Sequence, residues 1–279
     1  MLSNLGGPAK AAVFYAITLG LALLVCLAAP LFGETSLLIT MLTPVTAVLI
    51  IMLVVAPEGR ATAAWTSLGL ARAGLKGWPL AILGPVVILL ASYAIILAAG
   101  FGALAVPDLS RTVAATIANM GLSLLVGVLL AAGEEVGWRG YMLSRLSTIG
   151  LVPAMLIVGF LHGVWHLPLM LTTPYYHSAG NVLVVVPLFL VTLTLAGVFY
   201  GYLRVSTGSV WPVVIAHAVY NFVWGLMSEF VKAPSPETLE YVGGESGVLV
   251  IAGLVLVALV LVPRMRNLGF EQSASPAAA

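Results

Sequence analysis

The chain has 279 residues, of which 61% are hydrophobic and only 8% are charged, and its net charge is +1. A mean hydropathy of +1.14 excludes a water-soluble enzyme built around an ordinary core and indicates a membrane protein. The single cysteine, Cys26, excludes an intramolecular disulfide.

Apolar stretches long enough to cross a bilayer recur along the whole chain. A spanning helix needs about 20 mostly apolar residues, and such stretches lie near 11–31, 36–56, 78–104, 115–146, 150–171, 182–204, 209–231 and 247–263. They are too long and continuous for the roughly ten-residue alternating strands of a membrane barrel. We therefore expect an all-α, polytopic integral membrane protein with about eight transmembrane helices.

The distribution of cations predicts how the helices are oriented. With the amino terminus inside the cell, all eleven Lys and Arg residues except Arg111 and Lys232 fall on the cytoplasmic side. Both termini are therefore expected on that side. We expect a single transmembrane domain over 1–270, with its motif-bearing core at about 115–231, and a disordered Ser/Ala/Pro-rich tail at 271–279.

Two connecting segments are expected outside the membrane. The stretch 232–246 holds prolines, glycines and three glutamates, which is typical of an exposed loop. His177 follows a Thr-Pro-Tyr-Tyr turn in another connection, and we expect its side chain to be solvated.

Four polar side chains lie deep within the apolar stretches. One acidic side chain at the bilayer centre costs roughly 2.5–3.5 kcal/mol, so such residues usually have a function. At about 1.5 Å per residue from the cytoplasmic helix ends, Glu134, His166, His217 and Asn221 fall within roughly two turns of a common level. We expect these residues to meet in one site.

Helical spacing indicates which of the neighbouring side chains share a helix face. His217 and Asn221 are four apart and share a helix face, and Glu135 and Arg139 have the same spacing. Glu134 lies about 100° around the helix from Glu135. We therefore expect Glu135 to pair with Arg139, while Glu134 faces a cavity.

This set of groups is suited to acyl hydrolysis. A carboxylate sheltered between helices and assisted by a neutral imidazole can take a proton from water near neutral pH. The activated water attacks a peptide carbonyl, and the His217 imidazole and the Asn221 amide could stabilise the oxyanion, each by about 3 kcal/mol.

The residues and their order resemble the CPBP family, which includes type II CAAX prenyl proteases and bacterial Abi-type proteins. The likeness rests on Glu-Glu-x-x-x-Arg at 134–139, on a second motif ending at His166, and on His-x-x-x-Asn at 217–221, and it covers about 125–225. It implies that Glu134 activates water with His166 as its partner, and that His217 and Asn221 stabilise the oxyanion. By the same resemblance, the six site residues with an active-site role are Glu134, Glu135, Arg139, His166, His217 and Asn221.

The second motif departs from the family at one position. The family often has Phe or Trp four residues before the motif histidine, and this chain has His162 there. His162 could replace a packing residue, form an interhelical hydrogen bond, or add a polar group to the site.

The sequence leaves the metal question open. Glu134, His166 and His217, with His162 as a further candidate, could hold zinc in a His2Glu site. The metal-free glutamate mechanism fits the motifs better, so we expect no cofactor, with zinc as the alternative.

Two other functions use the same features. A proton-coupled transporter could use the buried Glu and His residues as a relay, but the sequence shows no internal repeat. A non-catalytic bacteriocin self-immunity or binding protein could lose a motif residue, and here all are present. We therefore favour an intramembrane endopeptidase.

The remaining expectations concern partners and location. We expect a peptide or protein substrate, which could be lipidated as in CAAX processing, contacts with membrane lipids, and no nucleic acid. We expect the protein in a bacterial plasma membrane, with its active site accessible from the cytoplasmic side.

Overall fold

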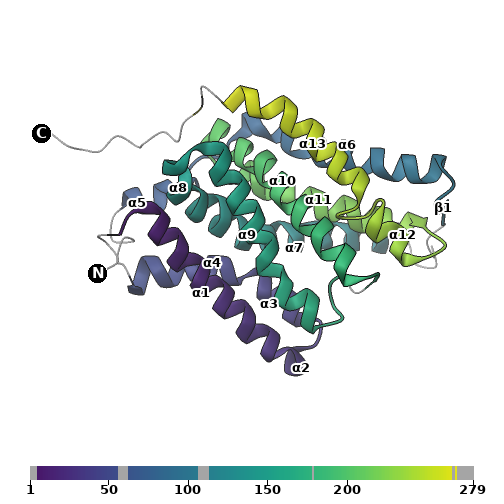
Figure 1. Ribbon diagram of the computed structural model, residues 1–279, viewed down its shortest axis with the longest axis horizontal. Coiled ribbons are helices and arrows are strands. Elements are labelled where there is room, and N and C mark those ends of the chain that lie inside the picture. The colour runs from purple at the N-terminus through teal and green to yellow at the C-terminus, as the bar shows by residue number, and fades with distance from the viewer. Residues whose placement is uncertain (1–4, 56–61, 106–112, 178, 266–267, 269–279) are drawn as a thin grey trace, which may run out of the picture.

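The computed structural model describes residues 5–55, 62–105, 113–177, 179–265 and 268 (Figure 1). About 82% of these residues are helical. The α-helices are α1 (Gly7–Leu27), α2 (Ala29–Phe32), α3 (Thr35–Met41), α4 (Thr43–Ile50), α5 (Thr62–Ser67), α6 (Trp78–Ala98), α7 (Val113–Glu135), α8 (Leu143–Leu146), α9 (Leu151–Thr172), α10 (Val182–Thr207), α11 (Trp211–Phe230), α12 (Pro236–Tyr241) and α13 (Val248–Arg264).

Short elements of other kinds interrupt or connect these helices. They are the π-helices η2 (Ile51–Val55) and η5 (Val136–Met142), the 3-10 helices η4 (Leu75–Gly77) and η6 (Ser147–Ile149), and the strands β1 (Ala103–Leu104) and β2 (Val231–Lys232). The two strands pair antiparallel, with Ala103 opposite Lys232.

Seven helical stretches within the described residues are long and apolar enough to cross a membrane. They are Gly7–Leu27, Thr35–Val54, Leu75–Ala98, Ala118–Ile149, Leu151–Thr172, Val182–Thr207 and Trp211–Phe230. The eighth predicted stretch is α13, which is apolar but has only 17 residues. The expectation of an all-α polytopic membrane protein is thereby confirmed. The domain limits 1–270 and the orientation of the termini stay predictions, and the tail 271–279 lies outside the described residues.

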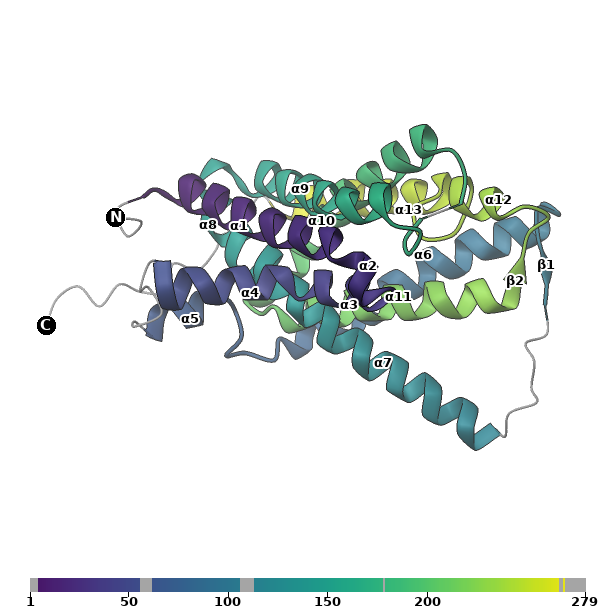
Figure 2. The same cartoon turned by 90° about the horizontal axis from the view of Figure 1, so that it is seen from below.

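Close packing of α9 on α10 sets the centre of the bundle. A Cβ atom added at Gly159 of α9 would overlap the backbone of Leu193, and one added at Gly197 of α10 would overlap the carbonyl of Met155. Small residues at such a crossing let two membrane helices approach closely. Helix α11 packs against α6 and α7, α13 packs on α10, and α1 lies against α4 and α9 (Figures 1 and 2).

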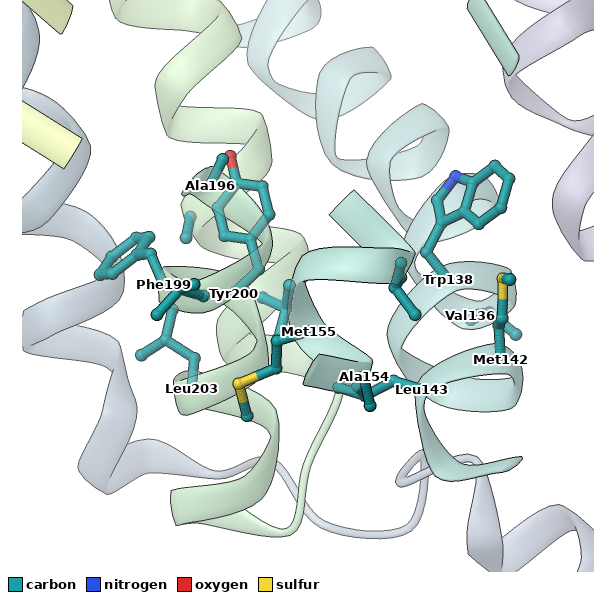
Figure 3. Close-up of a cluster of buried hydrophobic side chains, with 14 of the residues drawn as sticks. Val136, Trp138, Met142, Leu143, Ala154, Met155, Ala196, Phe199, Tyr200 and Leu203 are labelled. Atoms are coloured by element: carbon teal, nitrogen blue, oxygen red, sulfur yellow. The ribbon is translucent and has the colours of Figure 1, made fainter. Parts of the chain in front are cut away.

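The long fourth span changes from α-helix to π-helix within its polar motif. Helix α7 ends at Glu135 and continues as the π-helix η5, all seven residues of which are buried. Trp138 and Met142 of η5 belong to an apolar cluster that also includes Met155 of α9 and Leu203 of α10 (Figure 3). This packing holds the motif side chains in the interior.

The other end of α7 leans away from the bundle (Figure 2). Every residue from 118 to 126 is exposed, so the described protein buries none of this segment's side chains. Its leucines and valines would face lipid in a membrane.

Candidate active site

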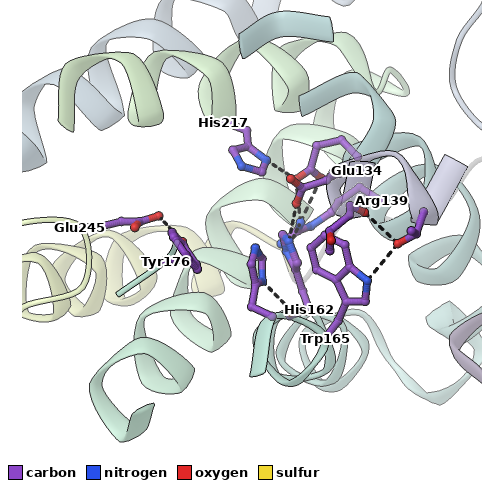
Figure 4. A network of polar contacts seen from close by, with 11 residues as sticks. Glu134, Arg139, His162, Trp165, Tyr176, His217 and Glu245 are labelled. Atoms are coloured by element: carbon purple, nitrogen blue, oxygen red, sulfur yellow. Dashed lines mark hydrogen bonds and ion pairs between the residues drawn. The ribbon is translucent and has the colours of Figure 1, made fainter. Parts of the chain in front are cut away.

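The residues singled out by the sequence meet in the interior from three spans. Glu134 and Glu135 end α7, Arg139 follows in η5, His162 and His166 lie on α9, and His217 and Asn221 lie on α11. Figure 4 shows Glu134, Arg139, His162 and His217 gathered together, with Tyr176 and Glu245 to one side. Glu134, Glu135, Arg139 and His162 are completely buried.

Glu135 is fixed by two partners. The guanidinium of Arg139 donates from Nη1 to both oxygens of Glu135, at 2.8 Å and 2.9 Å. Nδ1 of His217 lies 2.8 Å from Oε1 of Glu135, and since a carboxylate only accepts, the imidazole is the donor. The π-helical turn begins directly after Glu135, and π-bulges of this kind are frequent at functional sites.

Glu134 is held by only one of its oxygens. Nε2 of His162 lies 2.7 Å from Oε2 of Glu134. No described residue hydrogen-bonds the buried Oε1. A buried carboxylate oxygen without a partner is costly, so it indicates a place for water or substrate. The two neighbouring glutamates thus have different environments.

His166 offers one free ring nitrogen to this group. Its Nδ1 donates to the carbonyl oxygen of His162 at 3.0 Å, which leaves Nε2 with its lone pair. One ring nitrogen from each of His162 and His166 and one oxygen of Glu134 lie within 4.8 Å of one another. His166 is therefore close enough to Glu134 for a single water to contact both residues.

The same three residues define the possible metal site. The structure groups Glu134 with His162 and His166, whereas the sequence suggested His217 as the third ligand. Both nitrogens of His162 already have partners, Glu134 on one side and Arg139 at 3.2 Å on the other. The arrangement therefore fits a metal ion only if His162 gives up one of these hydrogen bonds.

A cavity of about 40 Å³ adjoins the cluster. That volume holds one or two water molecules, and its polar walls can bind them. It lies between α6, α9, α10, α11 and α13, and it is lined by Pro85, Ile88, His162, Thr192, Leu193, Ala196, Phe199, Tyr200, His217, Tyr220, Asn221, Glu245 and Leu254. Glu134 does not line this cavity, but its Oε2 is hydrogen-bonded to His162, which does.

Tyr200 is a site residue that the sequence gave no signal for. Its ring stacks on His217, with centroids 5.8 Å apart, and the guanidinium of Arg139 lies 4.9 Å from its centroid. Tyrosines in an apolar span are ordinary core residues, so only the packing of α10 reveals the contacts of Tyr200 with His217 and Arg139.

The expectations for the outer connections were wrong at two places. The side chain of His177 is only 2% exposed, because Nδ1 pairs with Glu240 at 2.7 Å and Nε2 with Glu245 at 2.9 Å. Residues 243–247 are buried as well, and Glu245 also accepts from the Tyr176 hydroxyl at 2.8 Å. Residues far apart in sequence form this cluster, so no local pattern could reveal it.

The ion pairs change the titration of this outer cluster. Burial alone lowers the pKa of His177, but hydrogen bonds to Glu240 and Glu245 raise it to about 10. Burial alone raises the pKa of Glu245, and the hydrogen bond from His177 brings it below its ordinary value. The imidazolium therefore stays charged at neutral pH and ties the connection after α9 to the segment before α13.

Comparison with known proteins finds one family for the part of the chain that carries these residues. Residues 116–223 match the family model described as type II CAAX prenyl endopeptidase Rce1-like. No curated protein matches the chain. The matched segment begins in α7, ends in α11 and contains all six residues of the three motifs. Over residues 116–223 the chain is therefore similar to type II CAAX prenyl endopeptidases, and this match supports a membrane protease of the CAAX type.

Proposed function

We propose that the protein is an intramembrane glutamic endopeptidase in which Glu134 is the base that activates water. The observation that supports this most directly is the state of its carboxylate. Oε2 is held by His162, and Oε1 is buried without a partner among the described residues. A free carboxylate oxygen, on a residue whose carboxylate lies within 4.8 Å of a ring nitrogen of His166, is suited to binding and deprotonating a water molecule.

The proposed reaction divides the site into a base and a pair of donors. Glu134 takes a proton from water, with His166 orienting that water, and the hydroxide attacks the peptide carbonyl. The Asn221 amide donates to the resulting oxyanion. His217 donates from Nδ1 to Glu135 and, when both ring nitrogens carry protons, can donate from Nε2 to the oxyanion. Glu134 then passes its proton to the departing amine as the C–N bond breaks.

The proposed mechanism is metal-free. A metal ion held by Glu134, His162 and His166 would compete with the hydrogen bonds that fix His162. We expect activity to survive dialysis against a zinc chelator. Inhibition by the chelator that added zinc reverses would replace this mechanism with metal-assisted hydrolysis.

The proposed setting is a bacterial plasma membrane. The excess of cations on one side favours access to the site from the cytoplasm. The proposed substrates are peptides or proteins that lie in the membrane or at its surface, with a lipidated carboxy-terminal tail as one form.

Cleavage of a peptide library in detergent tests the proposal. We expect Glu134→Gln to reduce turnover at least 10³-fold. We expect Asn221→Ala to reduce it about 10²-fold to 10³-fold, and His166→Ala and His217→Ala to be severely impaired. Glu229→Gln removes an exposed carboxylate at the outer end of α11, so it is the matched control and should keep native activity.

Three outcomes would contradict the proposal. Native turnover by Glu134→Gln would remove its central residue. Proton-dependent solute flux in proteoliposomes without cleavage would indicate a transporter, and tight peptide binding without turnover would indicate an immunity or binding protein.

A further inference from the structure

His162 occupies the position between the general base and the cavity. It is completely buried and also lines the cavity, and its Nε2 lies 2.7 Å from Oε2 of Glu134. On the other side of the ring, Nδ1 lies 3.2 Å from Nη1 of Arg139. The imidazole therefore bridges two residues that the α7–η5 segment carries five positions apart.

Arg139 determines which nitrogen of His162 carries the proton. A guanidinium has donors and no acceptor, so Nδ1 of His162 must be the acceptor. In the neutral ring the single proton is then on Nε2, where it is donated to Glu134. The same Nη1 also donates to Glu135, which holds the guanidinium in place.

We propose that His162 is a positioning residue for Glu134: Arg139 fixes its tautomer, and its Nε2–H holds Oε2 so that Oε1 is left as the base. The inference rests on the proposed function, and it assigns a role to the position where the sequence departs from the CPBP pattern. His162 acts through Glu134 and forms no bond to the substrate.

If His162 only packed against its neighbours, His162→Phe would be the milder substitution and His162→Gln the more harmful one. The His162 ring stacks on Trp138, with centroids 4.9 Å apart and planes 25° apart, and lies 5.8 Å from the ring of Trp165. Phenylalanine would preserve this aromatic packing but supply neither nitrogen. Glutamine would lose the packing, but its oxygen can accept from Arg139 while its nitrogen donates to Glu134.

Steady-state cleavage by two variants separates these roles. We expect His162→Phe to lower kcat about 10-fold to 100-fold with little change in KM. We expect His162→Gln to stay within about fivefold of the native kcat. Native kcat in His162→Phe together with a large loss in His162→Gln would overturn the proposal, and so would equal losses in both variants.

The tautomer can be measured without any turnover. The chain has four histidines, so the ¹⁵N NMR spectrum of histidine-labelled protein in bilayers can be assigned by comparison with His162→Gln. We expect His162 to be neutral with its proton on Nε2, and to lose this single state in Arg139→Met. His177, with a carboxylate at each nitrogen, is the doubly protonated reference.

The NMR result keeps failure of this inference distinct from failure of the proposed function. A proton on Nδ1 of neutral His162, or a spectrum that Arg139→Met leaves unchanged, overturns the inference whatever the activity. Equal cleavage by the native protein and by Glu134→Gln contradicts the proposed function. The measured tautomer would still show whether His162 accepts from Arg139 and donates to Glu134.

Discussion

Breaking the buried pair of Glu135 and Arg139 should cost more than removing both charges. Both side chains are completely buried, and the guanidinium reaches both carboxylate oxygens within 2.9 Å. Two unit charges 4 Å apart attract by about 4 kcal/mol at an effective dielectric constant of 20. Arg139→Met keeps most of the side-chain volume but leaves Glu135 charged in an apolar interior. Such a change typically costs about 3–5 kcal/mol.

The double variant Glu135→Gln/Arg139→Met should recover most of that loss. The glutamine is neutral, and its oxygen can still accept from Nδ1 of His217. We therefore expect a coupling free energy of at least about 2 kcal/mol between the two sites. Arg139→Met removes the hydrogen bond from Arg139 to His162 whether residue 135 is Glu or Gln, so this loss cancels in the coupling free energy.

Unfolding of the purified protein in detergent measures the effect. By the usual relation for a chain of this size, Arg139→Met should unfold roughly 10 °C below the native protein. Lys232→Met removes an exposed cation and should change the free energy of unfolding by less than about 1 kcal/mol. The reasoning is refuted if the double variant loses as much stability as the two single variants added together.

Three further predictions concern stability. The pKa of His177 is raised from 6.5 to about 10, so its stabilisation is complete below about pH 6.5 and is lost as the pH rises through 10. The free energy of unfolding of the native protein should fall over that range by about 5 kcal/mol, with a lower unfolding temperature as the readout, and His177→Gln should not show this fall. Gly197→Leu should be destabilised by roughly 1–3 kcal/mol or more, because its side chain would overlap the carbonyl of Met155. Gly121→Leu, with open space around it, should melt like the native protein, and an equally stable Gly197→Leu would contradict the close crossing of α9 and α10. Glu134→Gln should unfold no earlier than the native protein, since an amide removes a buried charge and still accepts from the imidazole; a lower unfolding temperature would show that the charge itself stabilises the fold.

Much of this architecture follows from local sequence pattern. Apolar length alone predicts the spans, because a helix satisfies its backbone hydrogen bonds within one segment. The four-residue spacing of Glu135 and Arg139 predicts a pair on one helix face, and the structure contains that ion pair. The depth of Glu134, His166 and His217 in separate stretches predicts that these residues can meet.

Tertiary structure decided which side chains contact one another across helices. His162 could be a packing residue or a polar one by sequence, and only the approach of α9 to the junction of α7 and η5 puts its nitrogens against Glu134 and Arg139. The pairing of His177 with Glu245 likewise joins connections 68 residues apart. Helix periodicity fixes the face on which a side chain lies, whereas its partner depends on helix crossings set by residues such as Gly197. The sequence by itself therefore determined the membrane helices and named the six candidate residues, whereas the packing of the helices determined their hydrogen bonds and brought His162 and Tyr200 against them.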